Sequence, residues 1–188
     1  KGVEIDHHTD RLSLLPFNLG NLGSRDVNLI ALTPRTSMDL RSSGGTFHER
    51  AAVMAALKSV WGGNRLRGRG VSRVFAGGIS DGPAQTREER IRARAAEFGS
   101  LPPRAEREFR RALERIDRKR RKDGLLRLED ELHEVAAAHS RGRVGNDIAN
   151  RRAVLIRELR EAMAYTGVQM LQPDLVILDE FQRFKELL

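Results

Sequence analysis

Two continuous apolar runs of strand length lie far apart in the sequence. The first is Val27–Leu32, which stops at Thr33 and Pro34, and the second is Asp174–Leu178 near the end of the chain. Neither run alternates apolar with polar residues, and this pattern is typical of strands that are buried on both faces of a parallel sheet. The two runs therefore predict an α/β fold built on a parallel sheet.

A helix is predicted shortly after the first run. Thr46 and Glu49 have the spacing of a capping box, and an alanine-rich apolar stretch follows them up to a Gly-Gly pair. Residues 62–85 are then rich in glycine and arginine. They predict an exposed connection that contains at most a short strand at Val71–Phe75.

From residue 86 onward the pattern is helical. Thr86 and Glu89 repeat the capping-box spacing, and the helical stretches that follow are separated by a Pro-Pro pair, by Gly124 and by residues 142–145. Apolar residues recur every three or four positions within these stretches, which predicts one buried face on each helix. The faces are Ala105, Phe109, Ala112, Leu113 and Ile116; then Leu128, Leu132, Val135 and Ala136; and finally Ile148, Leu155, Leu159, Ala162 and Met163, before Gly167 interrupts the pattern.

Positive charge is concentrated in this helical region. The chain of 188 residues has a net charge of +8, and residues 86–122 alone hold 14 Lys and Arg against 7 Asp and Glu, a net charge of +7. Such a basic window favours contact with a nucleic-acid backbone. A solvated helix face, with Glu106, Glu108 and Glu114 pairing the arginines, is the alternative. Membrane binding is disfavoured because Phe109 is the one aromatic residue on the apolar stripe.

The remaining composition narrows the classes of function. Cysteine is absent, which excludes disulfides, zinc-thiolate sites and thiol nucleophiles. No apolar run is long enough to span a bilayer, and the first residues do not have the basic-then-apolar pattern of a signal peptide, so a cytoplasmic location is expected. The chain begins without methionine and ends in an amphipathic run, and we interpret it as a piece of a longer protein.

Two residues with carboxylate side chains, Asp179 and Glu180, follow the second apolar run directly. In a buried strand this arrangement presents both groups to a ligand crevice. The aspartate can then hold Mg²⁺ through water, and the glutamate can activate an attacking water. The same residues also arise where any buried strand meets solvent, so the pair by itself leaves both interpretations open.

The string Pro173–Phe184 resembles motif II of superfamily 2 helicases and Swi/Snf-type translocases, and Val27–Ser37 resembles their motif Ib. Together with the Ser-Ser-Gly-Gly-Thr loop at 42–46, these strings are similar to bacterial helicase-related proteins of the DEAD/DEAH type, several of which occur in phage-defence loci. The resemblance covers residues 27–61 and 168–188. It implies part of a RecA-like parallel-sheet motor lobe with an all-α basic helical insertion.

Four segments follow from the resemblance. Residues 1–61 would form part of the RecA-like lobe with motif Ib, 62–85 a linker, 86–166 the basic helical insertion, and 167–188 the return to the lobe with motif II.

The resemblance also implies the site residues. Asp179 and Glu180 would be catalytic, with Asp179 holding Mg²⁺ through water. Gln182 would hydrogen-bond to the γ-phosphate or to a second lobe, although many relatives have His or Asp at this position. Hydroxyl and guanidinium groups before the first helix suit phosphate oxygens, although an ordinary strand-to-helix loop would have the same composition. The nucleic-acid-binding residues expected here are Thr33, Arg35, Thr36, Ser37 and Arg41.

The function expected is ATP-dependent movement on nucleic acid, with ATP and Mg²⁺ as cofactors, DNA favoured over RNA as the track, and partner proteins of a defence or repair complex. No G-x-x-x-x-G-K-[ST] phosphate loop occurs in the chain, so these residues alone are not expected to hydrolyse ATP. The alternative is a non-enzymatic basic helical module that binds nucleic acid or a partner protein.

Overall fold

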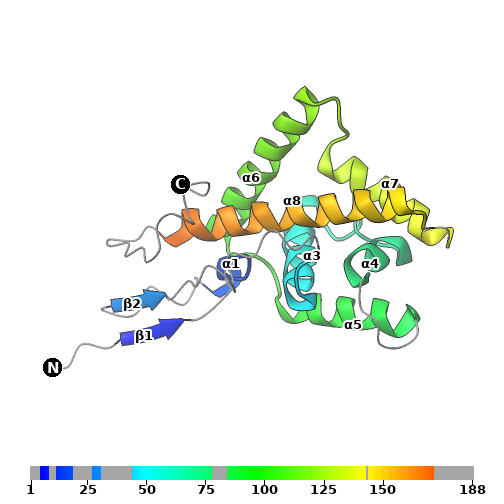
Figure 1. Cartoon of the computed structure of the whole chain (residues 1–188). Coiled ribbons are helices and arrows are strands. Elements are labelled where there is room, and N and C mark those ends of the chain that lie inside the picture. The colour runs from blue at the N-terminus through cyan, green and yellow to red at the C-terminus, as the bar shows by residue number, and fades with distance from the viewer. Residues whose placement is uncertain are drawn as a thin grey trace.

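The structure is a computed structural model, and it describes residues 5–8, 12–18, 27–30, 44–77, 84–142 and 144–171. Six helices make up most of this part of the chain (Figure 1). They are α3 (Phe47–Trp61), α4 (Arg69–Ala76), α5 (Ala84–Glu97), α6 (Pro103–Lys122), α7 (Leu128–Ser140) and α8 (Asn146–Leu171). A one-turn helix, α1 (Leu15–Asn18), and two strands, β1 (Ile5–His8) and β2 (Val27–Ile30), precede them.

The predicted α/β fold with a RecA-like parallel sheet is wrong for the part of the chain that the structure describes. The run at Val27–Ile30 is a strand, and it pairs in parallel with β1, with Ile5 opposite Val27. The described sheet, however, has two strands of four residues each. The apolar residues that a sheet core would need lie in helices that pack on one another. The second predicted strand, at 174–178, lies outside the described residues.

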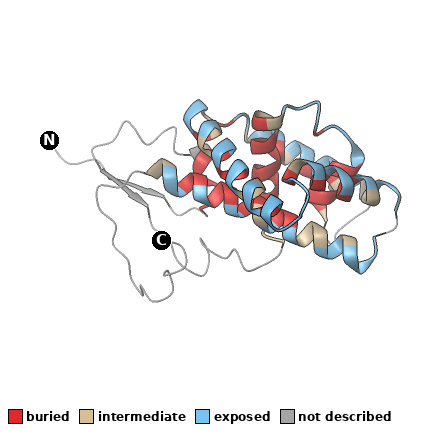
Figure 2. Ribbon diagram, turned by 90° about the horizontal axis from the view of Figure 1, so that it is seen from above, coloured by how far each residue is buried: buried red, intermediate tan, exposed pale blue. Residues whose placement is uncertain are grey.

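Helix α3 lies at the centre of this helical body. Its residues from Ala51 to Leu57 are all buried, and they contribute to a core shared with α4 to α8. Four of these residues are alanines, whose small side chains let neighbouring helices approach closely. Figure 2 shows the buried residues gathered where the helices cross, with exposed residues on the outer faces. A helix buried all round has no polar face, which explains the continuous apolar pattern of this segment.

The ends of α3 match the sequence prediction. The backbone N–H of Glu49 donates to the Thr46 hydroxyl at 3.2 Å, and the Thr46 N–H donates to the Glu49 carboxylate at 2.8 Å. This pair of bonds is a capping box. At the other end Gly62 has a φ of 87°, which few residues with a side chain adopt. The predicted start and stop of this helix are therefore confirmed.

The short strand predicted at Val71–Phe75 is wrong, because these residues belong to α4. Val71, Val74 and Phe75 are spaced as on one helix face and are buried. Gly70 explains how closely α4 packs, since a Cβ at this position would lie 2.1 Å from the carbonyl oxygen of Ala136 in α7. A run of this length fits a buried helix turn as well as a strand, so its composition could not decide between them.

Two further predictions on helix ends are corrected. Helix α5 begins at Ala84, so Thr86 lies inside it and does not cap it. Helix α8 continues through Gly167 to Leu171. A Cβ at position 167 would lie 2.5 Å from the carbonyl oxygen of Leu12, so this glycine permits a close packing contact and does not end the helix.

The predicted apolar faces of the later helices are confirmed where they are buried in the core. The residues concerned are Ala105, Phe109, Ala112, Leu113, Leu128, Leu132, Val135, Ala136, Leu155, Leu159, Ala162 and Met163, and Ile116 and Ile148 pack against them half-buried. Among the described helices, none combines the length and the apolar character that crossing a membrane would require.

Candidate nucleic-acid interface

The arginines of the helical body include two sets with different roles, and the first set supports the fold. Arg50 donates from Nε to the carbonyl oxygen of Phe75 at 2.7 Å, and Arg152 donates from Nε to that of Val74 at 2.6 Å and from its guanidinium to that of Gly77 at 2.7 Å. These carbonyls lie at the C-terminal end of α4, where a helix leaves acceptors without internal donors. Burial, together with the charges of neighbouring arginines, lowers the pKa of Arg50 to about 10. Burial also lowers the pKa of Arg152.

A buried ion pair ties the start of α3 to the second half of α8. Arg160 donates to Glu49 at 3.0 Å, and the Ser13 hydroxyl donates to the same carboxylate at 2.9 Å. Burial acts to raise the pKa of Glu49, but the hydrogen bond from Thr46 and the charge of Arg160 outweigh it, so the pKa is lowered. The Glu49–Arg160 pair therefore fixes the N-terminal end of α3 against α8.

Arg120 has the same supporting role where α6 meets α7 and α8. It is buried, it pairs with Glu158 of α8, and it lies 3.7 Å from Glu131 of α7. Burial, opposed by the charge of Arg120, raises the pKa of Glu158. Arg151 completes the cluster with two bonds of 2.9 Å to Glu131, and these bonds raise the pKa of Arg151. Part of the positive charge counted in residues 86–122 is therefore neutralised inside the fold.

The second set of basic residues forms a continuous row on the outer face of α6. Each member lies three or four positions after the one before it, so all share the face opposite the buried residues Ala105, Phe109 and Leu113. We call this row the α6 stripe. It consists of Arg104, Arg107, Arg111, Arg115, Arg118 and Lys122, and all six are exposed.

The α6 stripe has little internal compensation. Arg111 pairs with Glu108 at 2.7 Å, and the Arg115 guanidinium lies 5.2 Å from the centre of the Tyr165 ring. The other four side chains form no hydrogen bond or ion pair with the residues that the structure describes. At about 1.5 Å of rise per residue, the row is about 27 Å long. This length equals the axial rise of about eight base-pair steps at about 3.4 Å each.

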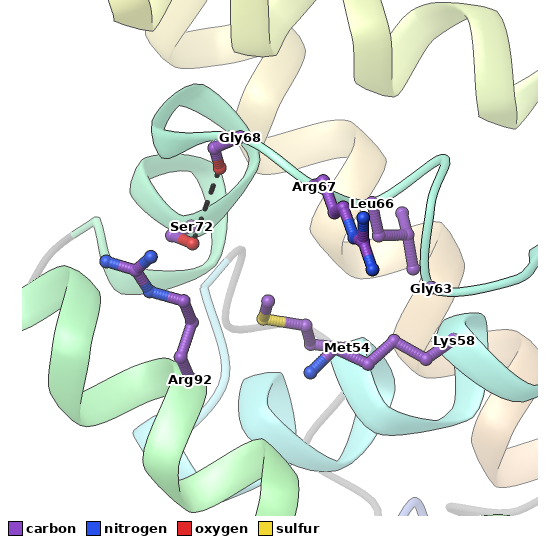
Figure 3. A pocket seen from close by; sticks show the side chains of 8 residues that line it. All are labelled: Met54, Lys58, Gly63, Leu66, Arg67, Gly68, Ser72 and Arg92. Carbon is purple, nitrogen blue, oxygen red and sulfur yellow. Dashed lines mark hydrogen bonds between the residues drawn. The ribbon is translucent and has the colours of Figure 1, made fainter.

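A second cationic feature is a cavity of about 480 Å³ between α3, α4 and α5 (Figure 3). Its basic lining residues are Lys58, Arg67 and Arg92, and no carboxylate lines it. Figure 3 shows Lys58 and Arg67 extending from facing walls toward the space beside Met54. The Arg92 side chain donates to the Glu88 carbonyl oxygen at 3.0 Å and lies 4.0 Å from the Glu88 carboxylate, whereas the side chains of Lys58 and Arg67 make no bond to the described residues. The cavity is suited to a phosphate group.

The site residues expected from the sequence lie outside the described residues. These are Thr33, Arg35, Thr36, Ser37, Arg41, Asp179, Glu180 and Gln182. The described residues include no group of three or more metal-ligating side chains. The α6 stripe could have been found from the sequence, because the spacing of its arginines is visible there. The division between supporting and exposed arginines could not, since it depends on which helices meet.

A scan against protein-family models and searches of curated proteins and of solved structures found no match for this chain.

Proposed function

We propose that this chain works within an ATP-dependent nucleic-acid helicase or translocase and that its helical body holds the nucleic acid. The observation that supports this most is the α6 stripe, six exposed cations on one face of a single helix. Arginine is well suited to phosphate because its planar guanidinium can form two parallel hydrogen bonds with one phosphate. Contacts with phosphates carry no sequence information, which fits a protein that moves along its track without sequence preference.

The ATPase part of the proposal rests on the residues that resemble helicase motifs. Asp179 would hold Mg²⁺ through water, and Glu180 would activate the water that attacks ATP. The architecture of the helical body supports a link between the two parts. The segment with Thr33 to Arg41 precedes α3, the segment with Asp179 follows α8, and the Glu49–Arg160 pair joins these two helices. Movement of nucleic acid held by the stripe could thus be coupled to ATP hydrolysis.

Substitution of Glu180 by Gln in the protein that carries this chain tests the ATPase part. Because the amide keeps the shape but cannot accept a proton from water, ATP binding should persist while hydrolysis falls by about 10²-fold or more. The matched control is Glu186→Gln, a charge loss six residues further on. Hydrolysis that is unchanged in the Glu180 variant would remove this residue from the mechanism.

The same stripe also supports a second function, a non-enzymatic module that binds nucleic acid. The two candidates differ in one observable, since only the motor would hydrolyse ATP faster when nucleic acid is added. Loss of that stimulation when stripe charges are removed favours the motor. Nucleic-acid binding without any ATP hydrolysis by the whole protein favours the module.

A further inference from the structure

The connection between α6 and α7 exposes two leucines. Leu125 and Leu126 are 52% and 40% exposed, and they are the first residues after the turn that ends α6. Figure 1 shows the C-terminal end of α6 and this connection projecting away from the other helices. We call the segment 119–127 the α6 tip. Two adjacent exposed leucines at a projecting tip are not explained by the packing of the helical body.

The backbone of the α6 tip is fixed by its own hydrogen bonds. The N–H of Gly124 donates to Arg121 at 3.2 Å, and that of Leu125 donates to Arg120 at 2.8 Å. With Gly124 at a φ of 71°, these bonds form a Schellman motif. The residue after the glycine usually makes an apolar contact with the last helical turn in this motif. In the α6 tip, the residue of the last helical turn that would make this apolar contact is Arg120. Its side chain is buried and bonds to other groups, so Leu125 stays half exposed.

Two side chains of α6 also hold the backbone on the C-terminal side of the α6 tip. Arg120 donates from Nε to the carbonyl oxygen of Leu126 at 2.6 Å while it pairs with Glu158. Asp117 accepts a hydrogen bond of 2.7 Å from the N–H of Leu128, the first residue of α7. The two leucines are therefore presented on a backbone held at both sides. A rigid apolar projection loses little conformational freedom when it inserts into a partner.

The charge around the leucines indicates the partner. Lys119, Arg121 and Lys122 lie in the last turn of α6, and their side chains form no hydrogen bond or ion pair with the described residues. Lys122 is also the last member of the α6 stripe. A polyanion held along the stripe would therefore reach the leucines directly. Proteins that distort nucleic acid insert apolar side chains such as leucine between base steps, next to basic residues that hold the backbone. The tip has no aromatic residue of the kind that anchors proteins in a lipid interface.

We propose that Leu125 and Leu126 insert between neighbouring bases of a nucleic acid bound along the α6 stripe and partly unstack them. This inference rests on the proposed nucleic-acid contact of the stripe. It adds that the helical body distorts its substrate as well as holding it. The substrate class would be a duplex that can be opened at a base step.

The test uses duplexes with 2-aminopurine, which fluoresces more when it is unstacked, placed at successive positions. Saturation with the 188-residue chain should raise the fluorescence severalfold at some positions. Substitution of both Leu125 and Leu126 by Ala should remove most of the rise and leave the affinity and its salt dependence nearly unchanged. Substitution of both by Met, which keeps the apolar volume, should preserve the rise. Replacement of Val144 and Val154, two other exposed apolar residues, by Ala is the matched control.

Three results would overturn the inference while leaving the proposed contact intact. In the first, the duplex binds but the fluorescence does not rise. In the second, the fluorescence rise is the same in the double Ala variant and in the Val control. The third is that the leucines are needed for binding to phosphatidylserine vesicles and not for the DNA signal. If the chain binds no duplex even at low salt, the proposed nucleic-acid contact fails, and the inference fails with it.

Discussion

Removal of two charges from the α6 stripe should weaken binding to nucleic acid in a calculable way. The variant substitutes both Arg107 and Arg118 by Gln. These residues are exposed and lie along the same line of the helix, and their side chains bond to none of the described residues. Their loss should therefore change the free energy of unfolding by less than about 0.5 kcal/mol, because surface substitutions away from packed or paired groups usually do.

The magnitude follows from the release of counterions. Each phosphate contact contributes about 0.9 to the negative slope of log K against log salt, so loss of two contacts should reduce that slope by about 1.8. At about 0.1 M salt the same two contacts are worth about 60-fold in affinity, or about 2.4 kcal/mol. Fluorescence anisotropy with a labelled duplex, measured over a series of salt concentrations, gives both the affinity and the slope.

The matched control substitutes Arg69 and Arg141 by Gln. Both arginines are exposed, and their side chains bond to none of the described residues. Their substitution reduces the net charge by the same amount as the stripe variant. A general attraction between a basic protein and a polyanion would weaken equally in both variants. Equal slopes in the two variants would therefore refute the assignment of the contact to the α6 stripe.

Three further predictions concern the support of this surface. Glu49→Gln should lower the stability by about 3–5 kcal/mol, because it leaves the buried Arg160 without its carboxylate, and urea denaturation would measure the loss. Gly167→Ala should lower the melting temperature measured by calorimetry, since its Cβ would meet the Leu12 carbonyl oxygen at 2.5 Å; an unchanged melting temperature would contradict this close packing. Burial and nearby arginines lower the pKa of His139. The stability that the neutral His139 contributes is therefore complete above pH about 6.5 and declines as the pH falls toward the folded pKa. His139→Gln should remove that part of the decline, measured by urea titrations at several pH values.

Local signals in the sequence predicted several helices correctly. The capping box at Thr46 and Glu49 predicted the start of α3, and the spacing of Phe109 and Leu113 predicted the buried face of α6. These features depend on residues within one or two helical turns. Their signals in the sequence can therefore be recognised without knowing how the rest of the chain folds.

The errors arose where the outcome depends on distant residues. A strand and a helix turn both fit the composition of Val71–Phe75. In the structure these residues are helical, and their helix packs closely on α7. Gly167 predicts an interruption of the helix, but the Leu12 backbone lies close to it and gives it a packing role. The candidate site shows the same limit. Arg118 and Arg120 look alike in the sequence, yet one is exposed on the stripe and the other is buried against Glu158.

The central claim is that nucleic acid lies along α6, and photo-crosslinking tests it most directly. The 188-residue chain would be irradiated with a duplex containing 5-bromodeoxyuridine, digested, and mapped by mass spectrometry. We predict that the crosslinked peptides concentrate in residues 104–127 and that Arg107→Gln with Arg118→Gln reduces them. Crosslinks confined to peptides outside α6 and its tip, with the same yield in that variant, would contradict the claim.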